Sequence, residues 1–424
     1  MIDIKLLREH PELVKENVAR RKNPEKLKLV DKAIKEDKAW RSCLQKLEKL
    51  KHEKNLATKK IALSGKSHDI ISHVKKLNKE IEVLKTRTEA HRKKLDSLML
   101  RIPNLLHESV PYGEDEHDNV EIRRWGKPPK RDFEPKDHLE ILEGLGLIDK
   151  ERAAKVSGNS FFYLMEELAL MDLAIQRFAI DFLRKKGFKL TIPPYMIRRK
   201  PYEGVTDIAD FEDVMYKIEG EDLYLIATSE HPIGARFMNE TLLEKDLPLK
   251  FAGVSPCFRK EVGAHGKYTK GLFRMHHFHK VEQFVFCKPE DSWKIHEELQ
   301  KNTEEMLQAL GLPYRVVNNC TGDIGIVAAK KYDTEILMAD GQYREVGSNS
   351  NCTDYQARRL NIKYREGVGK PPKGFVHTLN NTGLATSRVM IAIIETYQQK
   401  DGSIRVPKVL QPYMNGLKII KRKG

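Results

Sequence analysis

An arginine, carboxylates and an aromatic ring recur in two short segments that could together build a nucleotide site. In residues 257–263, the two-residue period of a strand places Arg259 and Glu261 on one face. A polar stretch with three glycines follows, which suits a long hairpin loop. On the return segment the same period groups a second set of side chains on one face: Arg274, His276, Phe278, Lys280 and Glu282. Phe273, Met275 and Val281 fall on the other face.

Two such strands would offer a planar guanidinium and a stacking ring on one surface. Arg259 could receive a phosphate or a carboxylate, because its fork of donors matches either group. Phe278 could stack on a base. A solvated amphipathic hairpin without any site is the alternative that these residues leave open.

Three further segments carry polar or charged side chains next to expected strands or helices. Thr228, Ser229 and Glu230 follow the apolar run 223–226, so we expect them at the end of a strand. Glu345 and Ser348 lie where a strand is expected to turn into a polar loop, and such oxygen ligands suit Mg²⁺. Arg388 stands just before the apolar helix expected over residues 389–394, where an arginine can meet a phosphate or form a structural salt bridge.

Composition limits the kinds of protein that the chain can be. Its 424 residues suffice for a large core and a second domain, and its formal net charge of +15 favours a polyanionic partner. No apolar run reaches the length of a membrane span, and the first residues lack the apolar core of a signal peptide, so we expect a cytoplasmic protein. The scattered cysteines argue against a disulfide framework and a zinc ribbon, and they leave open a zinc site assembled from distant residues: Cys43, Cys257, Cys287, Cys320 and Cys352.

The first hundred residues read as helix throughout. We expect a short amphipathic helix over residues 4–21 and two long helices separated at residues 64–67. The second long helix has an apolar seam with alternating steps of four and three: Ile70, Val74, Leu77, Ile81, Leu84, Thr88, His91, Leu95, Leu98 and Ile102. The first has a looser seam. Together they predict an antiparallel coiled-coil arm about 50 Å long.

Basic residues outnumber acidic ones in this predicted arm. They gather in clusters at residues 59–60, 75–76 and 92–94. A rigid rod studded with lysines suits the backbone of a nucleic acid, which is recognised by shape and charge. The alternatives are a solvated coiled-coil surface or an arm that pairs with another protein.

A polar linker at residues 111–118 leads into a region of mixed helices and strands. The predicted domains are therefore 1–108, which is helical, and 109–424, which gives the chain an α+β fold. Within the second domain, a helix over residues 168–186 is expected to run into a strand that ends at Pro193-Pro194.

Residues 258–282 resemble the second signature motif of class II aminoacyl-tRNA synthetases, in the version found in seryl-tRNA synthetases. The pattern is Phe-Arg-x-Glu, a loop, Thr-x-Gly-Leu-x-Arg-x-His, and then Phe-x-Lys-Val-Glu. Residues 187–194 and 377–388 are similar to the first and third motifs, and residues 228–230 and 343–359 to other segments of the family. The chain departs from the family pattern at a few positions: Gly347, Asn349, Asn381 and Thr382.

The resemblance implies an antiparallel class II catalytic sheet with flanking helices, behind an N-terminal coiled-coil arm that grips tRNA. It implies a homodimer joined through the first motif, and the commoner type of the family, in which no zinc is expected. The implied activity is ATP-dependent activation of L-serine and its transfer to the serine tRNA and, where it is present, to the selenocysteine tRNA. An enzyme for threonine or proline, and an inactive paralogue that binds tRNA or serves as a scaffold, are the alternatives.

The resemblance also assigns a role to individual residues. Arg259 and Arg388 are implied as the catalytic phosphate clamps, and Glu345 and Ser348 as the Mg²⁺ ligands. The implied serine pocket consists of Thr228, Ser229, Glu230, Glu282 and Thr382. The implied ATP site consists of Arg259, Lys260, Glu261, Met275, Phe278, Glu345, Val346, Gly347, Ser348 and Arg388.

Overall fold

The computed structural model of the chain describes residues 1–64, 68–207, 214–260 and 271–422. Glu261 and most of the predicted hairpin loop lie outside these residues. The chain divides into two compact units, residues 1–105 and 106–424.

The first unit is helical, as its sequence predicts. Its helices are α1 (Ile4–Glu9), α2 (Pro11–Ala19), α3 (Pro24–Ser64) and α4 (His68–Arg101). The prediction of a single helix over residues 4–21 is wrong, because the first helix ends before His10 and a second helix begins at Pro11. Proline has no N–H to continue a helix but suits the first position of a new one, so the two helices meet there.

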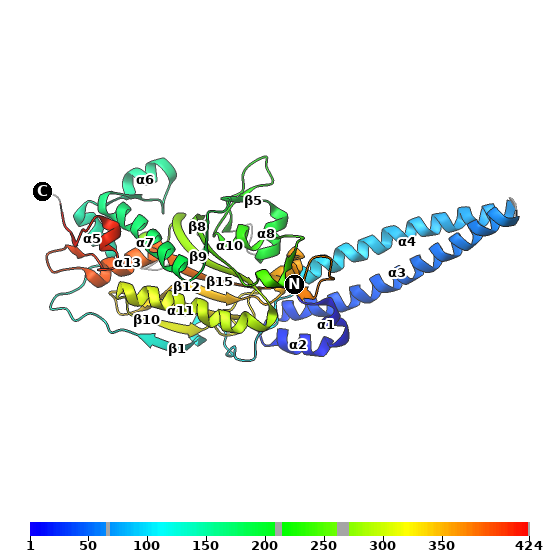
Figure 1. Cartoon of the computed structure of the whole chain (residues 1–424), viewed down its shortest axis with the longest axis horizontal. Helices are drawn as coiled ribbons and strands as arrows, with labels where there is room; N and C mark the ends of the chain where they lie inside the picture. The colour runs from blue at the N-terminus through cyan, green and yellow to red at the C-terminus, as the bar shows by residue number, and fades with distance from the viewer. Residues whose placement is uncertain (65–67, 208–213, 261–270, 423–424) are drawn as a thin grey trace. The chain divides into compact units, whose positions relative to one another are not determined.

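The predicted antiparallel arm is confirmed. Helices α3 and α4 lie side by side (Figure 1). Every member of the predicted seam on α4 is buried or partly buried, whereas most residues between them are exposed. On α3 the matching buried residues are small or apolar: Ala33, Cys43, Leu47 and Ala57. The seam of one helix therefore packs on that of the other, as in coiled coils.

Two buried carboxylates interrupt the seam at the base of the arm. Glu36 and Asp37 on α3 are only 7% and 2% exposed, so each needs a partner. The Asp37 carboxylate pairs with Arg8 of α1 and Arg41, at 2.7 and 2.8 Å. Glu36 pairs with two side chains of α4, at 2.5 and 2.9 Å: His91 and Lys94. These pairs tie α1 and α4 to the same turn of α3.

The second unit is built on an eight-stranded sheet. In spatial order its strands are β1 (Val120–Trp125), β10 (Tyr314–Asn318), β11 (Lys330–Leu337), β12 (Tyr343–Asn351), β15 (His377–Ala385), β9 (His277–Cys287), β8 (Leu249–Phe258) and β4 (Lys189–Thr191). Every neighbouring pair is antiparallel except β4 and β8. The predicted antiparallel core is thus confirmed, with one parallel strand at its edge.

Alternating side chains of the central strand β9 reach two different cores. Val281 and Val285 pack in one hydrophobic cluster with α7 (Glu166–Lys185), α11 (Ser292–Leu310) and α13 (Thr386–Tyr397). Phe284 and Phe286 pack in another cluster with three short helices: α8 (Arg199–Val205), α10 (Glu230–Gly234) and α12 (Tyr355–Leu360). Because successive side chains of a strand point to opposite faces, helices cover both sides of the sheet.

The remaining elements are short and lie around this framework. The helices are α5 (His138–Leu145) and α6 (Lys150–Ser157). The strands are β2 (Ile148–Asp149), β3 (Tyr163–Leu164), β5 (Met196–Ile197), β6 (Tyr224–Leu225), β7 (Thr241–Leu243), β13 (Lys363–Arg365), β14 (Gly374–Phe375), β16 (Ile404–Arg405) and β17 (Ile419–Ile420).

Three expected boundaries near the candidate site are wrong. The return strand of the hairpin begins at His277, because residues 271–273 form a 3-10 turn that starts at Gly271 with φ of +70°. Residues 347–351 do not form a polar loop, since β12 continues to Asn351 between two pairing strands. Nor does the helix expected over residues 389–394 begin after Arg388: β15 runs to Ala385, α13 begins at Thr386, and Arg388 lies inside its first turn.

Candidate active site

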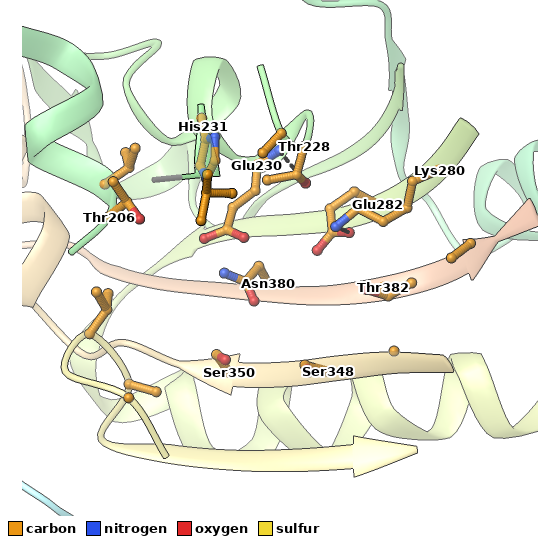
Figure 2. Close-up of a pocket in the computed structure, with 18 of the residues that line it drawn as sticks. Thr206, Thr228, Glu230, His231, Lys280, Glu282, Ser348, Ser350, Asn380 and Thr382 are labelled. Carbon is orange, nitrogen blue, oxygen red and sulfur yellow. Dashed lines mark hydrogen bonds and ion pairs between the residues drawn. The ribbon is translucent and has the colours of Figure 1, made fainter. Parts of the chain in front are cut away.

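A cavity of about 420 Å³ opens on the face of the sheet that carries α8 and α10. The strands β9, β15 and β12 lie below it, and Figure 2 shows Glu282, Thr382 and Ser348 on these three strands. Most of the predicted site residues line this cavity: Thr228, Glu230, Arg259, Phe278, Glu282, Glu345, Val346, Gly347, Ser348, Thr382 and Arg388. The structure therefore brings together residues that lie up to 160 positions apart in the sequence.

Four predicted residues are not among those that line the cavity. Ser229 is fully buried, and Met275 packs in the hydrophobic core with 6% of its surface exposed. Lys260 donates its backbone N–H to the Val214 carbonyl oxygen at 2.9 Å. Glu261 lies outside the described residues. The roles predicted for these four residues stay predictions.

The hairpin of β8 and β9 positions the first pair of functional side chains. Cys257 pairs with Phe278 in the register, and the Arg259 N–H donates to the His276 carbonyl at 3.0 Å. Beyond the last residue of β8, the Arg259 guanidinium lies over the Phe278 ring, 5.3 Å from its centroid. Its Nε also donates to the Ala227 carbonyl at 3.4 Å. The guanidinium and the ring that were predicted to share one surface do so.

A small polar recess lies beside this hairpin. Lys280 and Glu282 are two residues apart on β9, so both face the cavity. The Lys280 Nζ lies 2.7 Å from the Glu282 Oε2, and both residues are buried. Thr382 stands opposite Glu282 in the register of β15 and β9. Burial raises the pKa of Glu282, although the Lys280 ammonium and a hydrogen bond to Thr382 act against this rise.

Glu230 provides a second carboxylate in the same recess. It is the first residue of α10, and Figure 2 shows its carboxylate turned toward the space above β9 and β15. Burial and the negative charge of Glu282 raise the pKa of Glu230 to about 7. The neighbouring His231 is buried, and burial together with Lys280 and Arg259 lowers its pKa well below the usual value. The imidazole is therefore neutral, and it adds no positive charge to the recess.

At the other end of the cavity, a bulge in β12 brings an acid and a hydroxyl to one side. Residues three apart on a regular strand face opposite sides of a sheet. Between Glu345 and Gly347, however, the register with β11 shifts by one residue, and Val346 is the extra residue. As a result the Ser348 Oγ lies 3.3 Å from the Glu345 Oε1. It also donates a hydrogen bond of 2.6 Å to Asp333 of β11.

Arg388 meets the same carboxylate from α13. Its Nη1 lies 3.3 Å from the Glu345 Oε1 and donates to the Glu345 carbonyl at 3.0 Å. Partial removal from water opposes ionisation of this carboxyl, whose side chain is still 45% exposed, but the cations Arg388, Lys331 and Arg259 outweigh it and lower the pKa of Glu345. Burial and the charge of Glu345 raise the pKa of Asp333 to about 6. Glu345 therefore ionises at a lower pH than its neighbour Asp333, and both carboxyls are mainly ionised at neutral pH.

Two of the departures from the family pattern point away from the cavity. The Asn349 amide donates to the His296 carbonyl of α11 at 2.9 Å, and the Asn381 amide donates to the Leu299 carbonyl of the same helix at 2.7 Å. Both side chains thus join the sheet to α11 on its other face. Gly347 and Thr382 remain in the cavity, and they fit each other: a Cβ at Gly347 would lie 2.7 Å from the Cβ of Thr382.

Sequence reasoning missed several residues that line the cavity. Ser350 and Asn380 lie two residues from Ser348 and Thr382, so the strand period would have identified them. Nothing in their types could have identified the apolar residues 324–328, which come from a loop between β10 and β11. The other missed residues are spread over several elements and loops: Tyr202, Val205, Thr206, Asp207, Val214, Ala227, His231, Cys352 and Ala385.

Comparisons with known proteins agree with this geometry. The family model "tRNA synthetase class II core domain (G, H, P, S and T)" matches residues 214–397, and "Seryl-tRNA synthetase N-terminal domain" matches residues 1–106. A serine--tRNA ligase from Methanocella arvoryzae is 53% identical over 99% of this chain and 100% of that protein. One from Pyrococcus horikoshii is 50% identical over 99% of this chain and 98% of that protein.

Solved structures point to the same family. The crystal structure of seryl-tRNA synthetase from Pyrococcus horikoshii, complexed with ATP, matches with a TM-score of 0.95 and 49% identity over 100% of both chains. The cytoplasmic serine-tRNA ligase from Naegleria fowleri, in complex with AMP, matches with a TM-score of 0.89 and 40% identity over 100% of this chain and 99% of that one. The resemblance read from residues 258–282 is thereby confirmed: the chain belongs to the seryl-tRNA synthetase family.

Proposed function

We propose that this protein charges the serine tRNA with L-serine at the cost of ATP. In the first step a carboxylate oxygen of serine attacks the α-phosphorus of ATP, which forms seryl-adenylate and displaces pyrophosphate. In the second step a hydroxyl of the terminal tRNA ribose attacks the seryl carbonyl, and AMP leaves. The observation that carries this proposal is the single cavity in which two arginines and a carboxylate-lined recess meet.

The ATP part of the cavity requires no nucleophilic side chain. Arg259 binds the α-phosphate together with the serine carboxylate, and Arg388 binds the γ-phosphate. The adenine lies on the Phe278 ring and is held by Glu261 and the backbone of Met275. The remaining ATP contacts come from Lys260 and from the strand at Val346 and Gly347. Positioning the two reactants and neutralising the phosphate charge are together sufficient for this chemistry.

Glu345 and Ser348 are the residues that would hold Mg²⁺. Within the described part of the chain, no group of three or more His, Cys, Asp and Glu side chains is arranged to bind a metal. Two oxygen ligands nevertheless suit this ion, because Mg²⁺ keeps several waters and is completed by substrate phosphates. The bulge at Val346 supports the pairing, since it puts both oxygens on one side. A bound Mg²⁺ would neutralise charge on the phosphates.

The recess between α10 and β9 takes the serine side chain and ammonium. Five residues share this role: Thr228, Ser229, Glu230, Glu282 and Thr382. The buried carboxylate of Glu282 and the hydroxyl of Thr382 face each other across two strands, which supports a pocket that expects a hydroxyl group. Alanine would leave these groups without a partner, so the pocket should reject it.

The rest of the molecule supports binding of tRNA and pairing of two copies. Residues 1–108 form the proposed tRNA-binding domain and residues 109–424 the catalytic domain of a cytoplasmic homodimer. Exposed apolar side chains on α7 and the neighbouring edge strand β4 favour the dimer: Leu173 is 60% exposed and Leu190 45%, and Ile192, which follows β4, is 68% exposed. No described helix is long and apolar enough to cross a membrane. Charging of a selenocysteine tRNA stays a prediction.

Amino-acid-dependent exchange of pyrophosphate into ATP tests the proposal. Purified protein is assayed with a panel that includes serine, threonine, proline and alanine. Serine should support exchange at least about a hundredfold better than the other three. Preference for threonine or proline would indicate a different class II enzyme. No exchange with any amino acid would indicate an inactive paralogue. The charged residues that line the cavity argue against this alternative, because Arg259, Glu345 and Arg388 are all in place.

A further inference from the structure

Gln356 connects three elements beside the serine recess. It lies on α12, is fully buried, and does not itself line the cavity. Its Nε2 donates to the Val205 carbonyl at the end of α8, at 2.8 Å, and to the Glu230 Oε1 at 3.5 Å. Its Oε1 accepts a hydrogen bond of 2.6 Å from the Thr378 hydroxyl of β15.

The three partners fix which way the amide points. A carbonyl and a carboxylate can only accept hydrogen bonds, so they require the NH₂ end of Gln356. The Thr378 hydroxyl is oriented as a donor toward the other end. The amide therefore directs a hydrogen toward Glu230, and a hydrogen bond to a carboxylate stabilises its charged form.

We propose that Gln356 is a positioning residue for the amino acid substrate: it keeps the Glu230 carboxylate ionised and aimed at the ammonium of serine. This inference rests on the proposed function of the recess. Burial and Glu282 act to keep a proton on Glu230, whereas Lys280, Gln356 and Arg259 act to remove it. Of the three groups that favour the ionised form of Glu230, Gln356 alone carries no charge and does not line the cavity.

The effect of Gln356 must be separated from that of the other groups near Glu230. Those with a charge or a titratable proton come from every element around the carboxylate: Glu282, Lys280, Arg259, His231, Tyr202, Asp207 and Cys352. A variant that leaves all of them in place isolates the amide. Gln356→Met does so, because it keeps the length of the side chain and removes both hydrogen-bonding ends.

The test measures the KM for serine and for ATP between pH 5.5 and 9 in the exchange assay. In Gln356→Met the KM for serine should rise about tenfold at neutral pH, with the KM for ATP within about twofold of wild type. The fall in the serine KM with rising pH should also occur at a higher pH. The charged form of Glu230 has lost a hydrogen-bond donor, so its pKa rises. Gln300→Met is the matched control, since Gln300 is equally buried, on α11, and donates to Thr334 at 3.0 Å.

Gln300→Met should leave the pH dependence of the serine KM at its wild-type position. If Gln356→Met behaves like this control, Gln356 has only a structural role and the inference fails. If Gln356→Met does not fold, Thr378→Val replaces it: the hydroxyl that orients the amide is lost, and the same upward shift is expected in a smaller amount. An unshifted profile in that variant also overturns the inference. Absence of serine-dependent exchange in the wild type would instead contradict the proposed function.

Discussion

In the proposed function, Arg259 is the residue that binds both ATP and serine. It follows β8 directly. A hydrogen bond from its backbone N–H to the His276 carbonyl holds its backbone in place, and its guanidinium lies over the Phe278 ring. A guanidinium offers two parallel donors that match a phosphate and a carboxylate, whereas a lysine offers a single charged point. Arg259 lines the same cavity as the recess, and its charge also acts on Glu345.

Arg259→Ala should nearly abolish serine-dependent exchange, with a loss of about a thousandfold or more in kcat/KM. The transition state would lose its main stabilising charge at the α-phosphate. Arg259→Lys is the matched control and should recover only a small part of the rate, because it restores the charge without the fork. Exchange near the wild-type rate in Arg259→Ala would refute the assigned role.

The raised pKa of Glu230 predicts how serine binding depends on pH. Its value is about 7, so below that pH the carboxyl is mostly protonated and neutral. The serine ammonium prefers the ionised form, which is populated as the pH rises. The KM for serine should therefore fall between about pH 6 and pH 8 and then level off.

Glu230→Gln provides the check on this assignment. The variant cannot ionise at position 230, so its serine KM should be high and nearly constant over the same range. A wild-type KM that is flat between pH 6 and 8 would contradict the prediction, as would a variant that keeps the full pH dependence.

At the scale of elements, two irregular strands shape the cavity. The extra residue Val346 in β12 puts Glu345 and Ser348 on one side. A second register shift, between β15 and β9, makes Gly383 an extra residue between Thr382 and Leu384. A side chain does not fit there, because a Cβ at Gly383 would lie 2.8 Å from the Val281 carbonyl oxygen. Bulges of this kind redirect side chains within an otherwise regular sheet.

Gly347→Ala should weaken serine binding through Thr382. The new Cβ would lie 2.7 Å from the Thr382 Cβ, so the threonine must move away from Glu282. The KM for serine should rise about tenfold or more, with a smaller change for ATP. Gly144→Ala is the control, because a Cβ there would meet nothing within 4 Å. Equal serine KM values in the two variants would show that the contact has no influence on the recess.

The elements also show what the sequence could and could not predict. The two-residue period of a strand correctly predicted that Arg259, Phe278 and Glu282 share one face of the hairpin. The alternating four-residue and three-residue spacing of apolar side chains correctly predicted the arm. The same period failed for Glu345 and Ser348, because a one-residue shift in register leaves no mark on residue types. The polar residues 347–351 were expected to form a loop. The sequence does not show that the Asn349 amide donates a hydrogen bond to α11, on the face of the sheet opposite the cavity.

Over the whole molecule, catalysis and tRNA recognition are assigned to two separate compact units. The cavity residues all belong to residues 106–424, whereas residues 1–105 supply the long hairpin with its exposed basic clusters. The base of the hairpin is held by the pairs of Glu36 and Asp37 described above. Resemblance to a family predicted this division of labour, while composition alone predicted only a polyanionic partner.

A shortened arm should separate the two reaction steps. Glu36 contacts His91 and Glu53 contacts His73, so removal of residues 46–81 cuts both helices at the same level and keeps the base. Exchange should stay within about twofold of wild type, because the cavity is untouched. The kcat/KM for charging the serine tRNA should fall at least about a hundredfold, because phosphate contacts are lost.

A charge variant controls for indirect effects of the deletion. Replacing the exposed Lys75 and Lys76 with alanine keeps the full arm, and it should raise the KM for tRNA and lower its salt dependence. Equal charging by the full-length and shortened proteins would refute the role of the arm.

The most direct test of the proposed function is a crystal structure of the protein with a stable analogue of seryl-adenylate. In that complex the adenine should lie on Phe278 and the phosphate mimic should contact Arg259. The seryl ammonium and hydroxyl should lie within about 3.2 Å of oxygens of Glu230, Glu282 or Thr382. An analogue bound at another surface, or one whose seryl group makes none of these contacts, would contradict it.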